Sequence, residues 1–501
     1  MMRISKIFVF AALGLLTCAC GPEERKLPPV EPTNVPRYAS NIQYTSAMLG
    51  TVLAFDILLP EGYVQDTDKR YPVVYCFHGY GNDNTSWNNE YLKLEQKVKA
   101  AESKGMTPMI FVIPNGLKSY FCDNYSGSYP YMTMIAEEFI PYIDKTYRTL
   151  ADKQHRAVMG YSMGAFGALA TAMQHTDMFC ASAGLSISMR TDEQYMTESQ
   201  SAWNNQWGRI FGGSGTTGKD RLTDYYKSLC PLHQFTAENK AKYSQVQWFV
   251  TCGDNEKTLL YGNDDLHVMM LTNGYAHEYR VGEGGHSESY WNTALEEVLP
   301  WLSYVMDGGS DWEQQLLEVN VPTDFTPSAD GVFESEGYKS ASTGKAIYMF
   351  YNGIDKSWIN DAVGILQRGI SLKKFVILPC DTSVKSVGEW VAQYSGQYSF
   401  AASQAIALGS AGGPVLQGQD HFTTLYFDNA EIDYKMDVSK SVFYYLGQSD
   451  SNPHCADLNA LYKACKEADA GFNYRCRNHN SDARLDFLAG IEYIKLNLKD
   501  I

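Results

Sequence analysis

The alternation of short apolar runs with helical stretches is the feature of this sequence that most constrains its fold. Four runs have the length and apolar character of buried strands: residues 71–77, 109–114, 156–159 and 246–251. Helical patterns lie between them, at about residues 90–103, 131–146 and 164–175. Strands that alternate with helices build a mostly parallel sheet with helices on both faces. The sequence therefore predicts an α/β fold.

Composition and charge narrow the classes of protein to which this chain can belong. Of its 501 residues, 45% are apolar and 20% are charged, which is typical of a folded protein rather than a disordered one. The formal net charge of −16 repels phosphate backbones, so we expect no nucleic-acid partner. No apolar run of about 18 residues follows the N-terminal segment, which excludes a polytopic membrane protein.

The first residues have the pattern of an export signal. Two cationic residues precede an apolar run over residues 7–16, and small residues and cysteines follow. This order of charged, apolar and small residues is typical of a secretory signal peptide. Residues 15–21 resemble a bacterial lipobox, in which a cysteine becomes the lipidated N-terminus. We expect lipidation at Cys20, with Cys18 or a plain secreted signal peptide as the alternatives.

The segment that follows this signal is expected to be a tether. Residues 21–36 contain five prolines among polar residues, which predicts an extended chain. Its charged start, at residues 21–26, resembles the start of surface lipoproteins of the Bacteroidota. We therefore expect residues 1–20 to be a lipoprotein signal peptide and the protein to be exported. A lipid would anchor it to the bacterial outer membrane, on the cell surface or the periplasmic face, and would be its only membrane contact.

One pentapeptide carries the chemistry of a nucleophile. Residues 160–164 have the pattern G-x-S-x-G and lie between a predicted strand and a predicted helix. Such a tight strand-to-helix turn exposes a strained serine, and its glycines let the neighbouring backbone come close. Ser162 would also lie at a helix N-terminus, where the helix dipole favours negative charge. We identify Ser162 as the candidate nucleophile.

A serine nucleophile needs a base, and a base needs an orienting acid. His286 lies in a glycine-rich loop after a predicted strand and follows the serine in chain order, as this architecture requires. The acid should follow another strand, between the serine and the histidine. The strand that ends at Gly253 is followed by Asp254 and Glu256, and either carboxylate could reach the imidazole.

The oxyanion of an acyl-transfer reaction needs two N–H donors. One should be the backbone amide of Met163, the residue after the nucleophile. The other should come from the loop after the strand at 73–77, where the Tyr80 amide is the first candidate and Gly81 the alternative. His78 precedes them and is expected to have a structural role in this loop.

Four motifs together resemble a known family. They are residues 77–81, 160–168, 252–256 and 284–286, within a resemblance that spans about residues 40–305. In this order they are similar to the esterase D and feruloyl esterase group, carbohydrate esterase family 1. The resemblance implies an α/β-hydrolase fold and ester hydrolysis without a cofactor or metal. It also implies substrates such as feruloyl or acetyl esters on arabinoxylan.

The resemblance also bears on the acid and on substrate contacts. The family acid stands three positions after the strand-ending glycine, which favours Glu256 over Asp254, although the family usually has aspartate there. Residues 119–125 resemble the aromatic loop beside the family's site. Substrate contacts are therefore expected from Trp87, Tyr120 and Tyr125, with ordinary aromatic packing as the alternative.

The second half of the chain is similar to the first. Residues 404–413 align with residues 156–165, but Leu408 replaces the first glycine of the pentapeptide. Ser410, Asp450 and His479 are the candidates for a second triad. Because a side chain at Leu408 should crowd the turn, we predict a shorter, degenerate α/β-hydrolase copy. We expect this copy to be catalytically inactive and to support structure or glycan binding.

The predicted domain layout follows from these patterns. A polar, glycine-bearing stretch separates the two copies, and a segment at 187–243 without strong periodicity is expected to be an insertion that caps one end of the first sheet. The predicted parts are the catalytic domain at 37–306, a linker at 307–340 and the second copy at 341–501.

The cysteines predict no zinc site. Nine cysteines lie beyond Cys20, without a C-x-x-C motif or Cys/His metal spacing. Cys76, Cys180 and Cys252 lie in apolar runs and are expected to be buried free thiols. One pair among cysteines 455, 465 and 476 is expected to form a disulfide.

The function expected from the sequence is that of a serine esterase. It would remove feruloyl or acetyl groups from xylan or arabinoxylan fragments, through an acyl-enzyme and without a cofactor. Three alternatives stay open: an esterase for another small ester such as a siderophore, an acyltransferase, and a noncatalytic glycan-binding surface lipoprotein.

Overall fold

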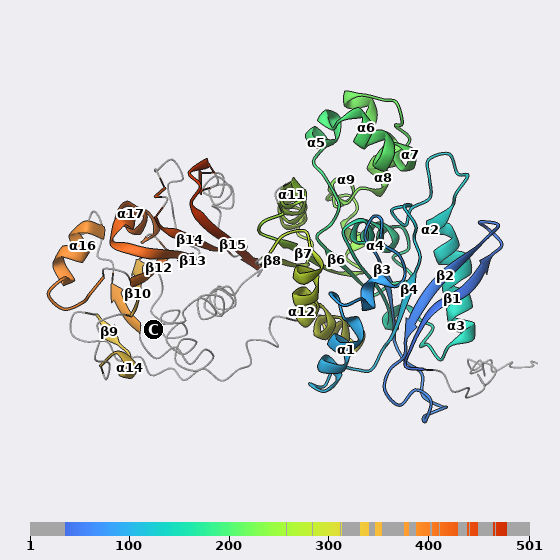
Figure 1. The fold of residues 1–501 in the computed structure, drawn as a ribbon, viewed down its shortest axis with the longest axis horizontal. Helices are drawn as coiled ribbons and strands as arrows, with labels where there is room; N and C mark the ends of the chain where they lie inside the picture. Colours follow the sequence, from blue (N-terminus) through green and yellow to red (C-terminus); the bar gives the residue numbers. More distant parts are fainter. Residues whose placement is uncertain are drawn as a thin grey trace, which may run out of the picture.

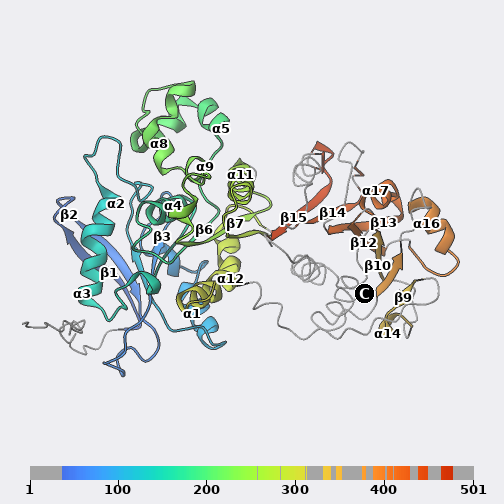
Figure 2. The same ribbon diagram turned by 180° about the vertical axis from the view of Figure 1, so that it is seen from behind.

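The computed structural model describes most of the first half of the chain and the central elements of the second. The described residues are 36–256, 258–282, 284–310, 312, 331–339, 346–352, 375–379, 387–400, 403–409, 411–428, 438–439, 441–448, 464–465 and 467–477. They form two α/β units that lie side by side (Figure 1; Figure 2 shows the reverse side). One 15-stranded sheet runs through both units. The fold class predicted from the sequence is therefore confirmed.

The first unit contains eight strands, in the order β1-β2-β4-β3-β5-β6-β7-β8. Strands β3 to β8 are parallel, and β1 and β2 form an antiparallel hairpin at the outer edge. Their bounds are β1 Tyr38–Ser46, β2 Thr51–Leu58, β3 Val73–Phe77, β4 Ile110–Pro114, β5 Arg156–Tyr161, β6 Ala181–Leu185, β7 Gln247–Gly253 and β8 Glu278–Gly282. The four predicted strands thus correspond to β3, β4, β5 and β7.

Helices cover both faces of this sheet. Successive side chains of β3 point to opposite faces, as the two-residue period of a strand requires. Tyr75 and Phe77 belong to one apolar core, with α4 (Met163–Gln174), whereas Val74 and Cys76 belong to the other. That second core also holds α1 (Leu94–Glu102) and α12 (Glu288–Met306). The parallel strands are buried on both sides, which explains why they are apolar without alternation.

Further helices complete the first unit. They are η1 Ser86–Asn88, α2 Tyr131–Met134, η2 Ile135–Phe139, α3 Ile140–Thr146, η3 Lys153–His155 and α11 Thr258–Thr272. Between β6 and β7 the chain forms the predicted insertion, which consists of α5 Asp192–Thr197, α6 Gln200–Ala202, η4 Trp203–Gly208, α7 Arg209–Phe211, η5 Gly218–Arg221, α8 Asp224–Leu229, α9 Pro231–Gln234 and α10 Lys240–Tyr243. Its helices α5 to α8 stand together at one end of the unit (Figure 1, green).

The second unit repeats the strand order of the first. Outward from the junction, the first unit runs β8-β7-β6-β5-β3-β4-β2 and the second runs β15-β14-β13-β12-β10-β11-β9. In each, six parallel strands are followed by an antiparallel strand, and the first unit adds β1 beyond it. The bounds are β9 Phe333–Glu334, β10 Ile347–Asn352, β11 Phe375–Pro379, β12 Ser403–Gly409, β13 Phe422–Asp428, β14 Phe443–Gln448 and β15 Gly471–Arg477, with helices α14 Glu336–Lys339, α16 Val387–Tyr394, α17 Gly412–Gln417 and η6 Gln419–His421.

The register of two central strands supports the repeat at the level of single residues. In the first unit Phe77 of β3 lies opposite Gly160 of β5. In the second unit Tyr351 of β10 lies opposite Leu408 of β12, the residue that the sequence alignment matches to Gly160. The predicted tandem copy is therefore present in the fold, and Leu408 occupies the position of the missing glycine.

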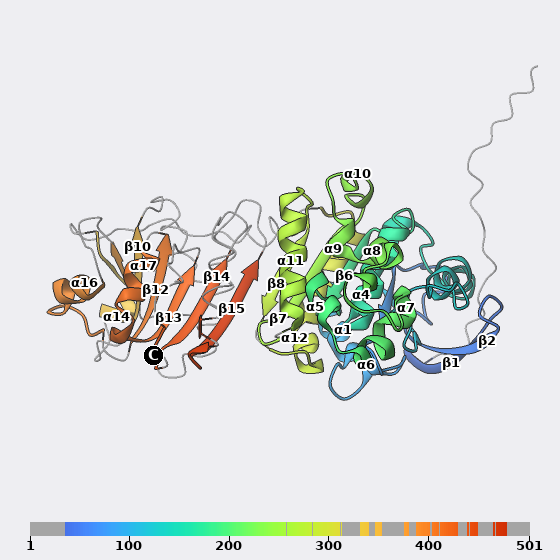
Figure 3. The same ribbon diagram turned by 90° about the horizontal axis from the view of Figure 1, so that it is seen from above.

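The two units join through their sheets. Strand β15 pairs antiparallel with β8, where Cys476 lies opposite Val281 and Arg477 opposite Arg280 (Figure 3). The second unit also begins earlier than the predicted boundary at residue 341, because β9 already pairs with β11. A strand of two residues is too short to leave a periodic signal in the sequence, which explains the difference.

The structure also describes most of the cysteines and the lengths of the helices. Cys76, Cys180 and Cys252 are buried free thiols, as predicted. Cys465 is also a free thiol, and Cys455 lies outside the described residues, so the expected disulfide stays a prediction for Cys455 and Cys476. None of the helices in the described ranges combines the length and apolar character that crossing a bilayer requires.

Helix α4 packs against the end of β3 with almost no space between the backbones. A β-carbon at Gly164 would lie 2.2 Å from the carbonyl oxygen of Phe77. No side chain can relieve this contact, because both partners are backbone. The sequence therefore needs glycine at this position to let the helix begin beside the strand.

We expect Gly164→Ala to lower the free energy of unfolding by about 3 kcal/mol, since an added methyl group must push backbone elements apart. Urea denaturation followed by tryptophan fluorescence measures this loss. Gly285→Ala is the matched control, because its β-carbon would make only an ordinary contact of 3.8 Å, with Asn255. Equal stability of the two variants would contradict the tight packing of α4 on β3.

Candidate active site

Ser162 lies in a sharp turn between β5 and α4. Its backbone has φ 55° and ψ −119°, a region that residues other than glycine rarely adopt. A β-carbon at Gly160 would lie 2.2 Å from the backbone of Gly164, so the two glycines of the pentapeptide meet across the turn. The predicted strand–serine–helix geometry is present.

Hydrogen bonds to neighbouring segments hold this strained residue in place. The Ser162 N–H donates to the carbonyl of Leu185 at 2.9 Å, and the Ser188 N–H donates to the carbonyl of Ser162 at 3.0 Å. Because both partners belong to β6 and the segment just after it, the sheet fixes the backbone of the turn. The fixed backbone thereby limits the directions in which the Ser162 side chain can point.

His286 lies between the serine and a carboxylate. Its Nε2 is 2.8 Å from Ser162 Oγ, and its Nδ1 is 2.8 Å from Glu256 Oε2. Since a carboxylate only accepts hydrogen bonds, Nδ1 carries the hydrogen. The other ring nitrogen, Nε2, faces the serine hydroxyl. The rings of His286 and Trp291 also pack edge to face, 5.0 Å apart.

Glu256 uses its two oxygens for different tasks. Oε2 faces His286, whereas Oε1 accepts hydrogen bonds from the Gly253 N–H, at 2.9 Å, and from the Ser186 hydroxyl. The carboxylate side chain is fully buried. The Trp291 indole N–H donates to Ser186 Oγ at 2.8 Å, which orients this hydroxyl toward the carboxylate. The acid is thereby held in one orientation.

The two candidate acids, Asp254 and Glu256, have different hydrogen-bond partners. Asp254 Oδ1 accepts a hydrogen bond from the Gly284 N–H at 3.0 Å, and the Asn255 N–H donates to the Gly284 carbonyl at 2.8 Å. Asp254 thus ties the segment after β7 to the loop that carries His286. Glu256, and not Asp254, contacts the imidazole.

Sequence reasoning missed Ser186 and Trp291. Ser186 follows β6 with a positive φ of 53°, and Trp291 lies on α12, so the two meet only in the folded chain. Neither belongs to a motif. The one signal near them is the position of Ser186 directly after a parallel strand, at the same sheet edge as the triad residues.

The expected oxyanion donors lie on segments that touch. A β-carbon at Gly164 would come within 2.7 Å of the His78 carbonyl, and one at Gly79 within 2.7 Å of the Tyr161 ring. The loop that carries Tyr80 therefore crosses the beginning of α4, where Met163 is the first residue. Within the described part of the chain, neither the Tyr80 nor the Met163 amide N–H donates to a protein acceptor. Gly81 follows in the same turn, with φ 85°.

His78 has the structural role expected for it. It is fully buried, and burial lowers the pKa of its imidazole to about 4, so the ring is neutral. Its Nε2 accepts the Gly116 N–H at 2.9 Å, and its Nδ1 then donates to the Gly79 carbonyl at 2.9 Å. The ring joins the loops after β3 and β4.

The three aromatic residues expected at the substrate have different surroundings. Trp87 is fully buried and packs on Tyr161 with ring centroids 5.0 Å apart, so it belongs to the core and does not line the site. The Tyr120 hydroxyl accepts from the Gln206 amide at 2.6 Å and lies 3.1 Å from Ser188 Oγ. Burial raises the pKa of Tyr120 to about 12. Tyr125 is 55% exposed.

The remaining sites considered are the possible second triad, the lipidated cysteine and a metal site. Ser410, Asp450 and His479 of the possible second triad lie outside the described residues, as does Cys20. Among the residues that the structure describes, no group of three or more histidine, cysteine, aspartate or glutamate side chains is placed to hold a metal ion.

A family model described as "Putative esterase" matches residues 46–302, about half of the chain. The chain belongs to this esterase family. The matched segment lies within the first α/β unit.

The chain is also similar to individual proteins. It is 31% identical over 267 residues to an endo-1,4-beta-xylanase/feruloyl esterase of Xylanibacter ruminicola, over 51% of this chain and 30% of that protein. It is 25% identical over 262 residues to Esterase Rv1288 of Mycobacterium tuberculosis, which covers 49% of this chain and 54% of that protein. The chain thus spans about half the length of that curated relative. A solved ferulic acid esterase is 29% identical, with a TM-score of 0.45, over 54% of this chain and 98% of that one.

We expect Glu256→Gln to lower kcat/KM by about a thousandfold or more, because the amide must present an N–H₂ group either to His286 Nδ1–H or to the Gly253 N–H. Initial rates with p-nitrophenyl acetate measure this effect. Asp254→Asn is the control. Asparagine still offers an oxygen to the Gly284 N–H, so its rate should stay within about fivefold of the unmutated rate. The opposite ranking would make Asp254 the acid.

Proposed function

We propose that this esterase removes feruloyl and/or acetyl groups from plant cell-wall xylan through an acyl-enzyme formed on Ser162. The observation that carries the proposal is the continuous hydrogen-bonded chain from Ser162 through His286 to Glu256, with both links at 2.8 Å. A serine, an imidazole and a buried carboxylate in this order are the parts that nucleophilic ester cleavage requires.

The first half of the proposed reaction forms the acyl-enzyme. His286 Nε2 takes the hydroxyl proton as Ser162 Oγ attacks the ester carbonyl, and the imidazolium keeps its hydrogen bond to Glu256. The amides of Met163 and Tyr80 stabilise the oxyanion. The carbon–oxygen bond to the sugar then breaks, and His286 returns the proton to the departing alcohol. The acyl group remains on the serine.

The second half repeats these steps with water. His286 takes a proton from a water molecule, whose oxygen attacks the acyl carbonyl, and the same amides stabilise the second oxyanion. The carboxylic acid leaves as the serine oxygen regains its proton from His286. The strained turn at Ser162 keeps the serine oxygen in one place throughout, so no reorganisation is needed between the two halves.

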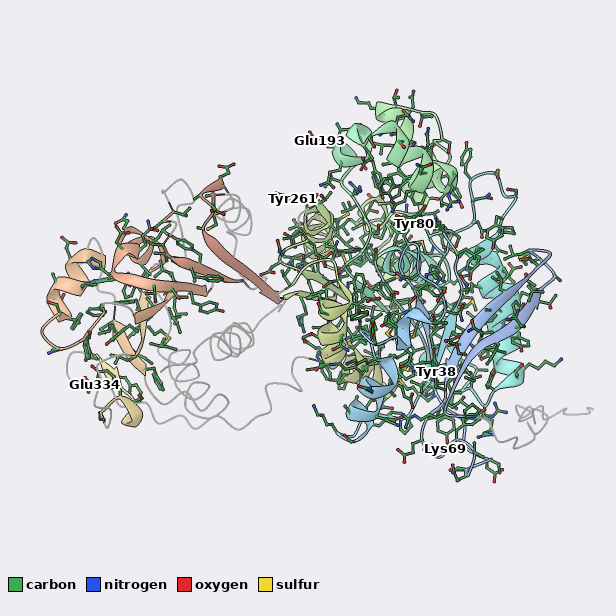
Figure 4. The ribbon with its side chains drawn as sticks, in the orientation of Figure 1. Tyr38, Lys69, Tyr80, Glu193, Tyr261 and Glu334 are labelled. Atoms are coloured by element: carbon green, nitrogen blue, oxygen red, sulfur yellow. The ribbon has the colours of Figure 1, made fainter. Side chains whose placement is uncertain are left out.

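One relative and the surroundings of Tyr125 and Tyr80 support a polysaccharide substrate. The Xylanibacter protein is named both as a xylanase and as a feruloyl esterase. Tyr125 is exposed on the loop after β4, where an aromatic acyl group or a sugar ring can pack on it. Tyr80 lies beneath the helices of the insertion (Figure 4). The insertion and the aromatic loop therefore border the approach to the serine.

The proposal extends to the whole chain. Residues 1–20 would be a lipoprotein signal peptide with Cys20 lipidated, and residues 21–36 a tether that holds the esterase at the outer membrane. The second unit would be catalytically silent and would support structure or glycan binding. The position of Leu408 favours this role, because a side chain there would crowd a turn of the kind formed at Ser162.

We expect the full chain to hydrolyse methyl ferulate or acetylated xylan, and Ser162→Ala to lower the rate by about a thousandfold or more, since the members of such a triad act as a unit. Ser410→Ala is the matched control and should retain full activity. Chromatography of the products, with and without added xylo-oligosaccharide as acceptor, distinguishes hydrolysis from acyl transfer.

Three outcomes would contradict this proposal. Activity that survives in Ser162→Ala but is lost in Ser410→Ala would place the chemistry in the second unit. Hydrolysis of a siderophore ester, with neither methyl ferulate nor acetylated xylan cleaved, would replace the substrate class. Glycan binding without hydrolysis of any ester would make the chain a binding protein.

A further inference from the structure

A cavity between the loop after β4 and the insertion has no role in the mechanism above. Its volume is about 300 Å³, at the small end of the range for ligand pockets. One wall comes from the loop after β4, with residues 117–119, and the other from α7 of the insertion. A cavity of this size accommodates a single sugar-sized group rather than an oligosaccharide.

The charge of this cavity is opposite to that of the chain. Lys118 and Arg209 line it, and no aspartate or glutamate does. Both side chains are exposed, and neither forms an ion pair with an acid in the described part of the chain. In a protein with net charge −16, two unpaired cations at one small cavity form a local site for an anion.

Both cationic residues make contacts with their surroundings. An Arg209 guanidinium N–H donates to the Lys118 carbonyl at 2.7 Å, which links α7 to the loop. Lys118 Nζ lies 5.2 Å from the centre of the Tyr80 ring, a cation–π contact. The remaining N–H groups of Arg209 are available for a forked contact with a carboxylate.

The same contacts connect the cavity with the segments that hold Ser162. Tyr80, on which the Lys118 ammonium lies, belongs to the loop that crosses the start of α4. From Lys118 the loop after β4 continues to Tyr120, whose hydroxyl lies 3.1 Å from Ser188 Oγ, and the Ser188 N–H donates to the Ser162 carbonyl. The loop after β4 therefore lines the cavity and also contacts the segment that holds the serine.

We propose that this cavity binds the carboxylate of an acidic sugar, a uronate, carried by the saccharide whose ester Ser162 cleaves. The walls that remain are largely apolar, with Leu117, Tyr129 and Ile210 among them. Apolar and aromatic surfaces pack on the C–H face of a sugar ring, while the guanidinium and the ammonium bind its carboxylate. The inference rests on the proposed function and deepens it, from xylan esters in general to esters on uronate-bearing chains.

Binding tests this inference independently of catalysis. The full chain carrying Ser162→Ala is titrated calorimetrically with methyl glucuronoside and, as the neutral probe, with methyl glucoside. We expect the glucuronoside to bind roughly tenfold more tightly, because only it offers a charge to Lys118 and Arg209. High salt should remove most of this preference, since the contact is electrostatic and partly exposed.

Variants show whether the preference comes from this cavity. Lys118→Gln/Arg209→Gln should abolish it, and Lys118→Gln alone, which keeps the Arg209 link between the two walls, should reduce it severalfold. Lys145→Gln/Lys219→Gln is the matched control. It removes the same charge from exposed positions outside the cavity and should leave the preference unchanged.

The result that overturns the inference is equal affinity for the two glycosides, or a preference that persists in Lys118→Gln/Arg209→Gln. Ferulate is titrated in parallel, because a reaction product also carries a carboxylate. If ferulate binds through the two cations and the glucuronoside does not, the cavity is a product site and the proposal is wrong. Failure of ester hydrolysis alone would contradict the proposed function but would leave this binding result unaffected.

Discussion

The sharp turn at Ser162 is the constraint on which the rest of this structure depends. A serine with φ 55° needs its neighbours to come unusually close, and Gly160 and Gly164 allow this because neither has a β-carbon. The same absence lets α4 begin against the end of β3, which brings the Tyr80 loop to the helix start. The strained backbone of Ser162 and the close packing of α4 on β3 thus have the same origin. Burial of the strands on both faces of the sheet stabilises the fold, and this stabilisation offsets the backbone strain at Ser162.

The two units compare one sheet order with and without glycine at this position. Both have the same strand order, and the register at Phe77/Gly160 and at Tyr351/Leu408 is the same. The strand order therefore does not require glycine at the position of Gly160. A side chain at Leu408 is compatible with β12 as a strand, but a β-carbon at the matching Gly160 would meet the backbone of Gly164. The fold can therefore be retained where the nucleophilic turn is not, because the packing of the sheet and the geometry of the nucleophile depend on different residues.

The features that local sequence patterns encode could be predicted from the sequence. The apolar strands, the pentapeptide at 160–164 and the glycine-flanked His286 were all visible, because each is specified by its immediate neighbours. Glu256 over Asp254 needed a family resemblance, since both carboxylates follow the same strand. Ser186 and Trp291 were missed and Trp87 was misjudged, because contacts between β6, α12 and the loop after β3 exist only once the chain is folded. The two-residue β9 was too short to leave a pattern.

Reaction with a fluorophosphonate probe tests the central claim most directly, because this probe modifies serines only when a neighbouring base activates them. Peptide mapping of the labelled full chain by mass spectrometry should find one modified residue, Ser162, and no modification when His286 is replaced by alanine. Labelling of Ser410 or another serine, or labelling of Ser162 that does not depend on His286, would contradict the account.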